Sequence, residues 1–272
     1  MTNNFNIKGH SGCTIEVKKD VVVKSASTKK YSERLYLQHN KQINFNDRNI
    51  KAPTIYNSGK LNGCFWFEME RIPFSTFDSF MLMGDKKALD RVAKKIIKFI
   101  NKNIIGIKKI DKNIIIKKYE KTKDNIFIKH GIDLNYLNSF FYNLDKDIFI
   151  PEGYCHGDLT FSNMLFDNSD IAFIDFLDTF LESPLQDIVK IRQDTKYFWS
   201  LNLLNEIQDN LKIKQSLNYI DTIIENEFIQ KSWYKKCYNY FQALNLLRII
   251  PYSQNYNHID KLINETKILC LH

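Results

Sequence analysis

The eight residues His-Gly-Asp-Leu-Thr-Phe-Ser-Asn at 156–163 constrain this chain more than any other stretch. Two short apolar runs follow them, at residues 164–166 and 171–174, and a polar turn at 167–170 separates the two runs. Such a pattern predicts two strands of a hairpin. Asp175 stands where the second strand ends. The sequence therefore predicts a loop, a hairpin, and a carboxylate that the hairpin carries back toward the loop.

The spacing of three polar residues in this stretch suits phosphoryl transfer. That reaction needs a carboxylate near the acceptor hydroxyl and oxygen ligands for Mg²⁺ on the nucleotide phosphates. An Asp followed by four residues and an Asn lets one tight loop present Asp158 at its start and the amide oxygen of Asn163 at its end. The hairpin brings Asp175 beside Asn163. We therefore predict Asp158 as the catalytic base and Asn163 and Asp175 as the metal ligands.

These residues resemble a known family. His156, Asp158 and Asn163 match the protein-kinase pattern H-x-D-x-x-x-x-N, and Asp175-Phe176-Leu177 stands where that family has D-F-G. With Gly157 after the histidine, the match is closer to the aminoglycoside phosphotransferase and choline kinase superfamily, which phosphorylates small molecules on a protein-kinase-like fold. The longer string looks most like the members associated with bacterial surface-polysaccharide synthesis.

The resemblance implies an α+β, bilobal fold. Its N-terminal lobe, residues 1–72, would hold a small antiparallel sheet with one helix and bind the nucleotide, and residues 73–272 would form a mainly helical catalytic and acceptor-binding lobe. The implied activity is ATP- and Mg²⁺-dependent transfer of the γ-phosphate to a hydroxyl of a sugar, polyol or amino alcohol. Leu177 replaces the glycine of D-F-G and no A-P-E segment follows, so a protein substrate is not expected.

Two other functions stay open at this point. One is a catalytically inactive kinase-like module that binds nucleotide and acts through a glycan-assembly partner. The other is a basic nucleic-acid-binding protein, because the net charge is +8. However, no recognisable nucleic-acid module accompanies the charge. The sequence is rich in Lys, Asn and Ile together, which indicates a compositional bias, so we interpret most lysines as solvated surface.

A predicted hairpin, residues 14–17 and 21–24, follows a turn that contains two glycines. Glycine lets backbone amides approach a phosphate closely. We therefore expect Gly9, Ser11 and Gly12 to contact the nucleotide phosphates. An ordinary hairpin turn is the competing interpretation, because the longer G-x-G-x-x-G form is absent.

Lys24 ends an apolar strand, which is an unusual place for a charge that has no partner. A helix is predicted next, with Ser27 or Thr28 as its N-cap. In the resembling family the strand lysine holds the α- and β-phosphates and pairs with a helix glutamate, and Lys24 and Glu33 are the matching positions. Coincidental surface charge is the competing interpretation for both.

The resemblance also marks two structural segments. An aromatic strand that ends before Pro73 would run into the hinge, where backbone groups near Glu70 to Ile72 would meet the adenine. Ser183-Pro184 suits the start of a helix. Asp187 in its first turn would brace the catalytic loop, and we assign it a structural role.

The remaining features exclude other classes of protein. Five scattered cysteines without C-x-x-C spacing indicate reduced thiols and argue against a zinc site. A transmembrane helix is not expected, because the sequence contains no run of about 18 apolar residues. The first residues lack the pattern of a signal peptide. A cytoplasmic protein is therefore expected. The sequence specifies neither the acceptor, nor a preference for ATP over GTP, nor the oligomeric state.

Overall fold

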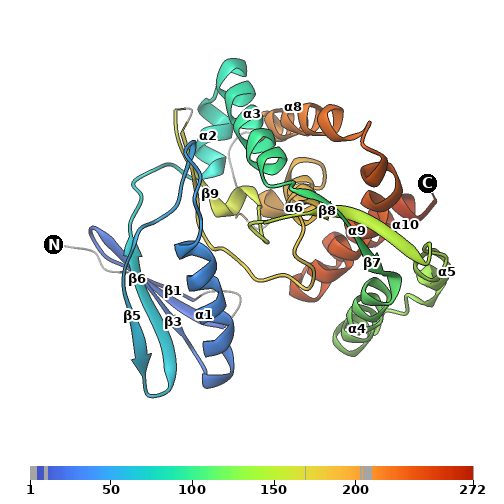
Figure 1. Cartoon of the computed structure of the whole chain (residues 1–272), viewed down its shortest axis with the longest axis horizontal. Coiled ribbons are helices and arrows are strands. Elements are labelled where there is room, and N and C mark those ends of the chain that lie inside the picture. The colour runs from blue at the N-terminus through green and yellow to red at the C-terminus, as the bar shows by residue number, and fades with distance from the viewer. Residues whose placement is uncertain (1–4, 9–11, 169, 203, 205–209, 272) are drawn as a thin grey trace.

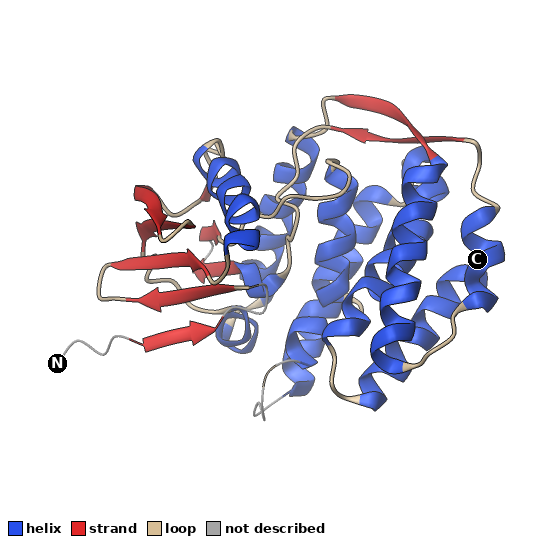
Figure 2. Cartoon of the chain, turned by 90° about the horizontal axis from the view of Figure 1, so that it is seen from below, coloured by secondary structure: helices blue, strands red, loops and turns tan. Residues whose placement is uncertain are grey.

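The computed structural model describes residues 5–8, 12–168, 170–202, 204 and 210–271. Strands gather at one end of the molecule and helices form most of the other end (Figure 1, Figure 2). The N-terminal elements, in chain order, are β1 (Phe5–Lys8), β2 (Cys13–Val17), β3 (Val21–Ala26), α1 (Lys29–Ile43), β4 (Ile50–Lys51), β5 (Ile55–Leu61) and β6 (Cys64–Glu70).

The rest of the chain is mainly helical. Its elements are α2 (Phe77–Met83), α3 (Lys86–Lys102), β7 (Gly106–Asp111), α4 (Lys112–His130), α5 (Asn138–Tyr142), β8 (Asp147–Glu152), β9 (Met164–Asp167), β10 (Asp170–Phe173), α6 (Pro184–Thr195), α7 (Trp199–Asn202), α8 (Asn210–Phe228), α9 (Ser232–Ile249) and α10 (Tyr256–Leu271), with short 3₁₀ turns at Asn135–Leu137, Phe161–Asn163 and Ile250–Tyr252.

The N-terminal sheet has five strands in the order β1-β2-β3-β6-β5, and each neighbouring pair is antiparallel. This confirms the predicted small sheet and its first hairpin. Alternate residues of β6 face α1, and Phe65 and Phe67 are buried there with Leu35. Thr28 is the N-cap of α1, because its hydroxyl accepts a hydrogen bond from the backbone N–H of Tyr31.

Helix α6 lies within the helical part and packs against α8 and α9. All its residues are buried, including four that are charged. Ser183 is its N-cap and Pro184 its first residue, as the sequence predicts. A strongly amphipathic α3 begins after the N-cap Asp85 and covers the same core.

Two contacts join the sheet region to the catalytic hairpin. β9 and β10 pair as the predicted antiparallel hairpin, and the short β4 adds to β10 in parallel. Ser75, just beyond β6, exchanges two backbone hydrogen bonds of 2.8 Å with Phe166. The end of β6 is therefore anchored beside the hairpin that follows the catalytic loop.

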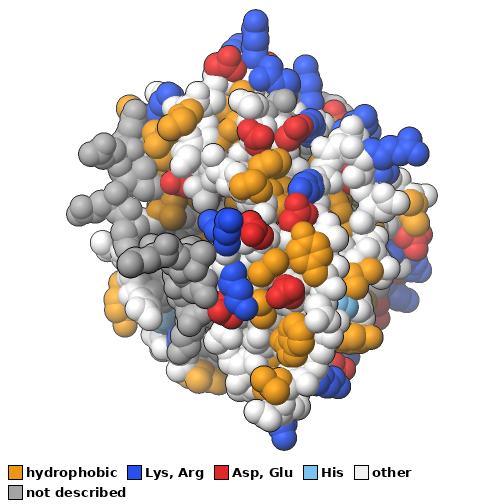
Figure 3. Space-filling model, turned by 90° about the vertical axis from the view of Figure 1, so that its left-hand side faces the viewer, with side chains coloured by type: hydrophobic (Ala, Val, Ile, Leu, Met, Phe, Trp, Pro, Cys, Tyr) orange, Lys and Arg blue, Asp and Glu red, His pale blue; other side chains and the backbone are white. Residues whose placement is uncertain are grey.

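No helix among the described residues is long and apolar enough to cross a membrane. On the face shown in Figure 3, positive and negative side chains are interspersed among apolar ones.

Candidate active site

The catalytic loop is fixed at its start by His156, whose side chain is fully buried. Its Nε2 lies 3.1 Å from the carbonyl oxygen of Ile174, and the backbone N–H of Asp158 donates to Nδ1 at 3.3 Å. Nε2 therefore carries the proton, because Nδ1 accepts. Burial lowers the pKa of His156 to about 4, so the ring is neutral near pH 7. The imidazole ties the loop to the end of β10.

Two buried carboxylates of α6 accept hydrogen bonds from backbone N–H groups of the catalytic loop. Asp187 accepts hydrogen bonds from the backbone N–H groups of His156 at 2.7 Å and Gly157 at 2.9 Å. Asp194 accepts from the N–H of Phe161 at 2.6 Å and from the N–H and hydroxyl of Ser200, both at 2.9 Å. The geometry fits the bracing role expected of Asp187. Asp194 was not predicted, although a spacing of seven residues puts it on the same helix face as Asp187.

Asp158 lies between two donors. Its Oδ1 is 3.0 Å from the Nζ of Lys190, a buried residue of α6, and its Oδ2 accepts from Asn163 Nδ2 at 3.0 Å. Burial alone would raise the pKa of Asp158, but Lys190, His156 and Asn163 together hold that pKa below its ordinary value. The carboxylate is therefore ionised at neutral pH and available to orient a hydroxyl.

Asn163 and Asp175 are brought together as predicted. The backbone N–H of Ile174 donates to the carbonyl oxygen of Asn163 at 3.0 Å, which places Asp175 one residue away. Asn163 Nδ2 also donates to the Asp158 carbonyl at 2.8 Å, so its amide oxygen is the atom left for a ligand. Asp175 has a left-handed backbone, with φ of +59°. One amide and one carboxylate oxygen suit Mg²⁺, which takes its other ligands from phosphates and water.

The lysine of β3 meets its partners across the two halves of the molecule. Lys24 is buried, forms an ion pair with Asp175 and donates to Gln38 Oε1 of α1 at 3.1 Å. Burial alone would lower the pKa of Lys24, but Asp175 raises it above its ordinary value. Glu33 does not pair with Lys24 as expected from the resemblance, because its side chain is exposed. The buried face of α1 consists of Ser32, Leu35, Gln38, His39 and Gln42.

The structure describes only some of the residues that we expect to contact the phosphates and the adenine. Gly9 and Ser11 lie outside the described residues. Gly12 has a left-handed φ of +87°, and its carbonyl oxygen accepts from Ser27 N–H at 3.0 Å. At the hinge, Glu70 N–H donates to Thr54 O at 2.8 Å, and its carboxylate binds Lys51. The N–H of Ile72 has no hydrogen-bond partner among the described residues.

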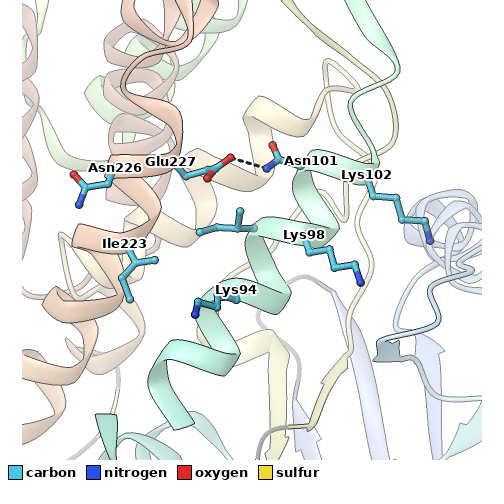
Figure 4. A pocket seen from close by; sticks show the side chains of 8 residues that line it. Lys94, Lys98, Asn101, Lys102, Ile223, Asn226 and Glu227 are labelled. Atoms are coloured by element: carbon cyan, nitrogen blue, oxygen red, sulfur yellow. Dashed lines mark hydrogen bonds between the residues drawn. The ribbon is translucent and has the colours of Figure 1, made fainter. Parts of the chain in front are cut away.

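A separate groove lies between α3 and α8 and contains none of these residues (Figure 4). Asn101 donates to Glu227 across it at 2.7 Å, while Lys98 and Lys102 extend away from α8. Among the described residues, no three His, Cys, Asp or Glu side chains come together as a metal site. The predicted site at Asn163 and Asp175 needs no such group, because phosphate oxygens would complete it.

Comparison with known proteins supports this reading of the fold. The model of the phosphotransferase enzyme family matches residues 140–211, which include the catalytic loop, the hairpin and all of α6. No curated protein matches the chain in sequence.

Solved structures match almost the whole chain. A thermostable mutant of aminoglycoside phosphotransferase APH(4)-Ia is 14% identical, with 98% of this chain and 94% of that chain covered and a TM-score of 0.60. The N202A variant of a thermostable APH(4)-Ia mutant, in a ternary complex with AMP-PNP and hygromycin B, is 12% identical, with coverage of 98% and 93% and a TM-score of 0.62. ADP-bound aminoglycoside phosphotransferase APH(2'')-Ib is 12% identical, with coverage of 98% and 92% and a TM-score of 0.60. The chain therefore has the protein-kinase-like fold of the aminoglycoside phosphotransferases.

Proposed function

We propose that this protein is an ATP- and Mg²⁺-dependent phosphotransferase that moves the γ-phosphate to a hydroxyl of a small molecule. The observation that carries the proposal is the convergence of Asp158, Asn163, Asp175 and Lys24 from three separate segments on one partly buried network. Residues 1–72 would act as the nucleotide-binding lobe and 73–272 as the catalytic and acceptor-binding lobe. A sugar, polyol or amino alcohol used in surface-polysaccharide synthesis is the proposed acceptor, which rests on the resemblance of the 156–165 motif.

The reaction follows from the positions of these groups. The acceptor oxygen attacks the γ-phosphorus, the bond from that phosphorus to the β–γ bridging oxygen breaks, and ADP leaves. Asp158 orients the acceptor hydroxyl and takes its proton. A positioned general base contributes about 10²- to 10⁴-fold to the rate. Asn163 and Asp175 would hold Mg²⁺, which neutralises phosphate charge when it is bound.

Lys24 would bind the phosphates by exchanging partners. Within the described part of the chain it has one anionic partner, Asp175, and one neutral partner, Gln38. A phosphate oxygen offers the ammonium group a second anion, so the nucleotide competes with Asp175 for Lys24. Adenine would lie at the hinge, where the N–H of Ile72 is available as a donor.

Thermal unfolding with Mg²⁺ and either ATP or GTP tests the nucleotide site. A ligand that binds only the native state raises the melting temperature by mass action. We expect a Mg²⁺-dependent rise that Asp175→Ala abolishes. Asp167→Ala is the matched control, because Asp167 is an exposed carboxylate at the end of β9 in the same hairpin. No rise with either nucleotide contradicts the proposal.

Measurement of turnover distinguishes an active phosphotransferase from a catalytically inactive module. We expect Asp158→Asn to keep the nucleotide-dependent rise in melting temperature and to lose about 10²- to 10⁴-fold in rate of ADP formation. If the unaltered protein binds nucleotide but forms no ADP with any acceptor that is tested, the result favours the inactive module. A rise with an arbitrary DNA duplex that disappears with salt would favour the nucleic-acid-binding alternative.

A further inference from the structure

The segment that follows Asp175 is surrounded by cations from three helices. Arg34 of α1 lies 3.3 Å from Asp178. Lys118 of α4 and Arg248 of α9 lie against one aromatic ring, with Lys118 Nζ 5.4 Å and Arg248 Cζ 5.5 Å from the centroid of Phe180. Figure 1 shows this segment running between α1 on one side and the ends of α4 and α9 on the other.

Two of these cations have no anionic partner in the described part of the chain. Neither Lys118 nor Arg248 forms an ion pair or a side-chain hydrogen bond there, although both are partly buried. Their contact with Phe180 is a cation–π interaction, which is weaker than an ion pair and leaves the charge unneutralised. Two nearby carboxylates, Asp178 and Asp158, are already paired, with Arg34 and Lys190. The cluster therefore carries an excess of positive charge.

The cluster lies near the catalytic carboxylate, because α9, which carries Arg248, packs against α6, which carries Lys190. Lys190 contacts Asp158 directly, and the charge of Asp158 opposes the burial that lowers the pKa of Arg248. Burial, followed by the charges of Arg248, Lys121 and Arg34, lowers the pKa of Lys118 to about 8. Holding like charges together in this way costs free energy, and an anion placed among them would recover it.

Five aromatic residues in the C-terminal part of the chain do not provide an alternative site for a cation. Tyr197, Trp199, Trp233, Tyr234 and Tyr238 are buried in the main core, as their helical spacing indicates. Tyr234 and Tyr238 contact the buried Arg192. These five rings are therefore not free to enclose a quaternary amine.

We propose that the acceptor of this phosphotransferase is an anion, a hydroxyl compound that already carries a phosphate or carboxylate group bound by Arg248 and Lys118. This proposal rests on the proposed function, because it places the acceptor beside Asp158. The acceptor hydroxyl would face Asp158 while its charged group lies against the two unpaired cations. A polycationic aminoglycoside or choline would meet the same charges with repulsion.

Pairs of acceptors that differ mainly in charge test whether the enzyme prefers an anionic acceptor. ADP formation is measured with Mg²⁺ and ATP for glycerol against glycerol 3-phosphate, and for glucose against glucuronate, with choline and kanamycin as cationic acceptors. We expect kcat/KM to be at least about tenfold higher for an anionic acceptor than for its neutral partner, since charge-assisted hydrogen bonds to an anion are strong. The phosphate and carboxylate arms identify which anion the site accepts. Preference for a neutral or cationic acceptor overturns the proposal.

Substitutions of Arg248 and Lys118 test whether these two cations cause the preference for an anionic acceptor. Arg248→Met and Lys118→Met should each raise KM for the anionic acceptor at least about tenfold, and Arg248→Lys should recover part of the loss. Lys98→Met removes the same charge from an exposed position on α3 and should leave the ratio of anionic to neutral acceptor unchanged. Equal ratios in Arg248→Met and in the unaltered protein contradict the proposal.

The test also separates this proposal from the function on which it depends. Absence of any stabilisation by Mg²⁺ and ATP would refute the proposed phosphotransferase itself. If Mg²⁺ and ATP stabilise the protein but no acceptor is phosphorylated, calorimetry on the protein saturated with Mg²⁺ and ADP measures binding of glycerol 3-phosphate and glucuronate. Binding of either that Arg248→Met weakens supports the anionic site, whereas binding of neither rejects it.

Discussion

Replacement of Gly157 by alanine tests how closely the catalytic loop is held against the segment after Asp175. Gly157 has φ of +92°, and a Cβ added there would lie 2.0 Å from the carbonyl oxygen of Leu177. The neighbouring hydrogen bond from Leu177 N–H to His156 O, at 3.1 Å, holds the two segments together. Relief of the clash therefore requires the backbone of one segment to move by more than about 1 Å, since ordinary contacts are near 3.5 Å.

Three effects lower the free energy of unfolding of Gly157→Ala. A left-handed backbone costs alanine about 1–2 kcal/mol, overpacking adds about 1–3 kcal/mol, and loss of the hydrogen bond to His156 adds about 1 kcal/mol. We expect Gly157→Ala to lower the free energy of unfolding by about 3–6 kcal/mol. Displacement of the loop by about 1 Å should also cost on the order of 10²-fold in turnover.

Gly131 offers a matched control. It caps the end of α4 with φ of +69°, and a Cβ added there meets no atom within 4 Å. Gly131→Ala should therefore cost only the backbone component, about 1–2 kcal/mol, and leave turnover unchanged. Urea denaturation of both variants, followed by measurement of ADP formation, gives the comparison. The reasoning is refuted if Gly157→Ala is no less stable than Gly131→Ala or keeps full turnover.

Three further predictions concern buried charges. Burial raises the pKa of Asp187 from 3.8 to about 7, so the unfolded chain loses this proton at lower pH than the folded protein does. The stability advantage of the unaltered protein over Asp187→Asn should therefore be largest near pH 4 and shrink as the pH rises to about 7; an advantage that grows over this range would show that the carboxylate is ionised in the fold. Arg192→Met should cost about 3–5 kcal/mol in urea denaturation, because it leaves the carboxylates of Asp221 and Glu225 without their buried partner; a loss below about 1 kcal/mol would contradict this. Lys24→Met should abolish the rise in melting temperature with Mg²⁺ and ATP, and a rise equal to that of the unaltered protein would exclude Lys24 from the nucleotide site.

Local spacing made the catalytic stretch predictable. The hairpin of β9 and β10, the start of α6 at Ser183, and the approach of Asn163 to Asp175 follow from short-range patterns of apolar and turn residues. The β7 and β8 pair was missed, because β7 contains two lysines and buries only one residue fully. A strand that buries few apolar side chains leaves little periodic signal in a sequence.

Long-range partners were harder to predict. Glu33 has the residue type expected opposite Lys24, but the side that α1 buries depends on which residues face β6, and that face carries Gln38. The pairing of Lys190 with Asp158 joins residues 32 positions apart in sequence through the packing of α6 under the catalytic loop. A lone lysine among apolar residues of a predicted helix gave no sign of its partner.

Helix α6 explains why the active site is held so firmly despite lying in loops. Asp187, Lys190 and Asp194 recur at steps of three and four residues, so they share one face of the helix, and each contacts the catalytic loop. Buried charges cost desolvation free energy, and apolar residues of similar size would pack there at least as stably. The polar face is therefore better explained by the site than by the core. Two carboxylates fix backbone N–H groups at both ends of the loop, and one ammonium group sets the charge state of Asp158 between them.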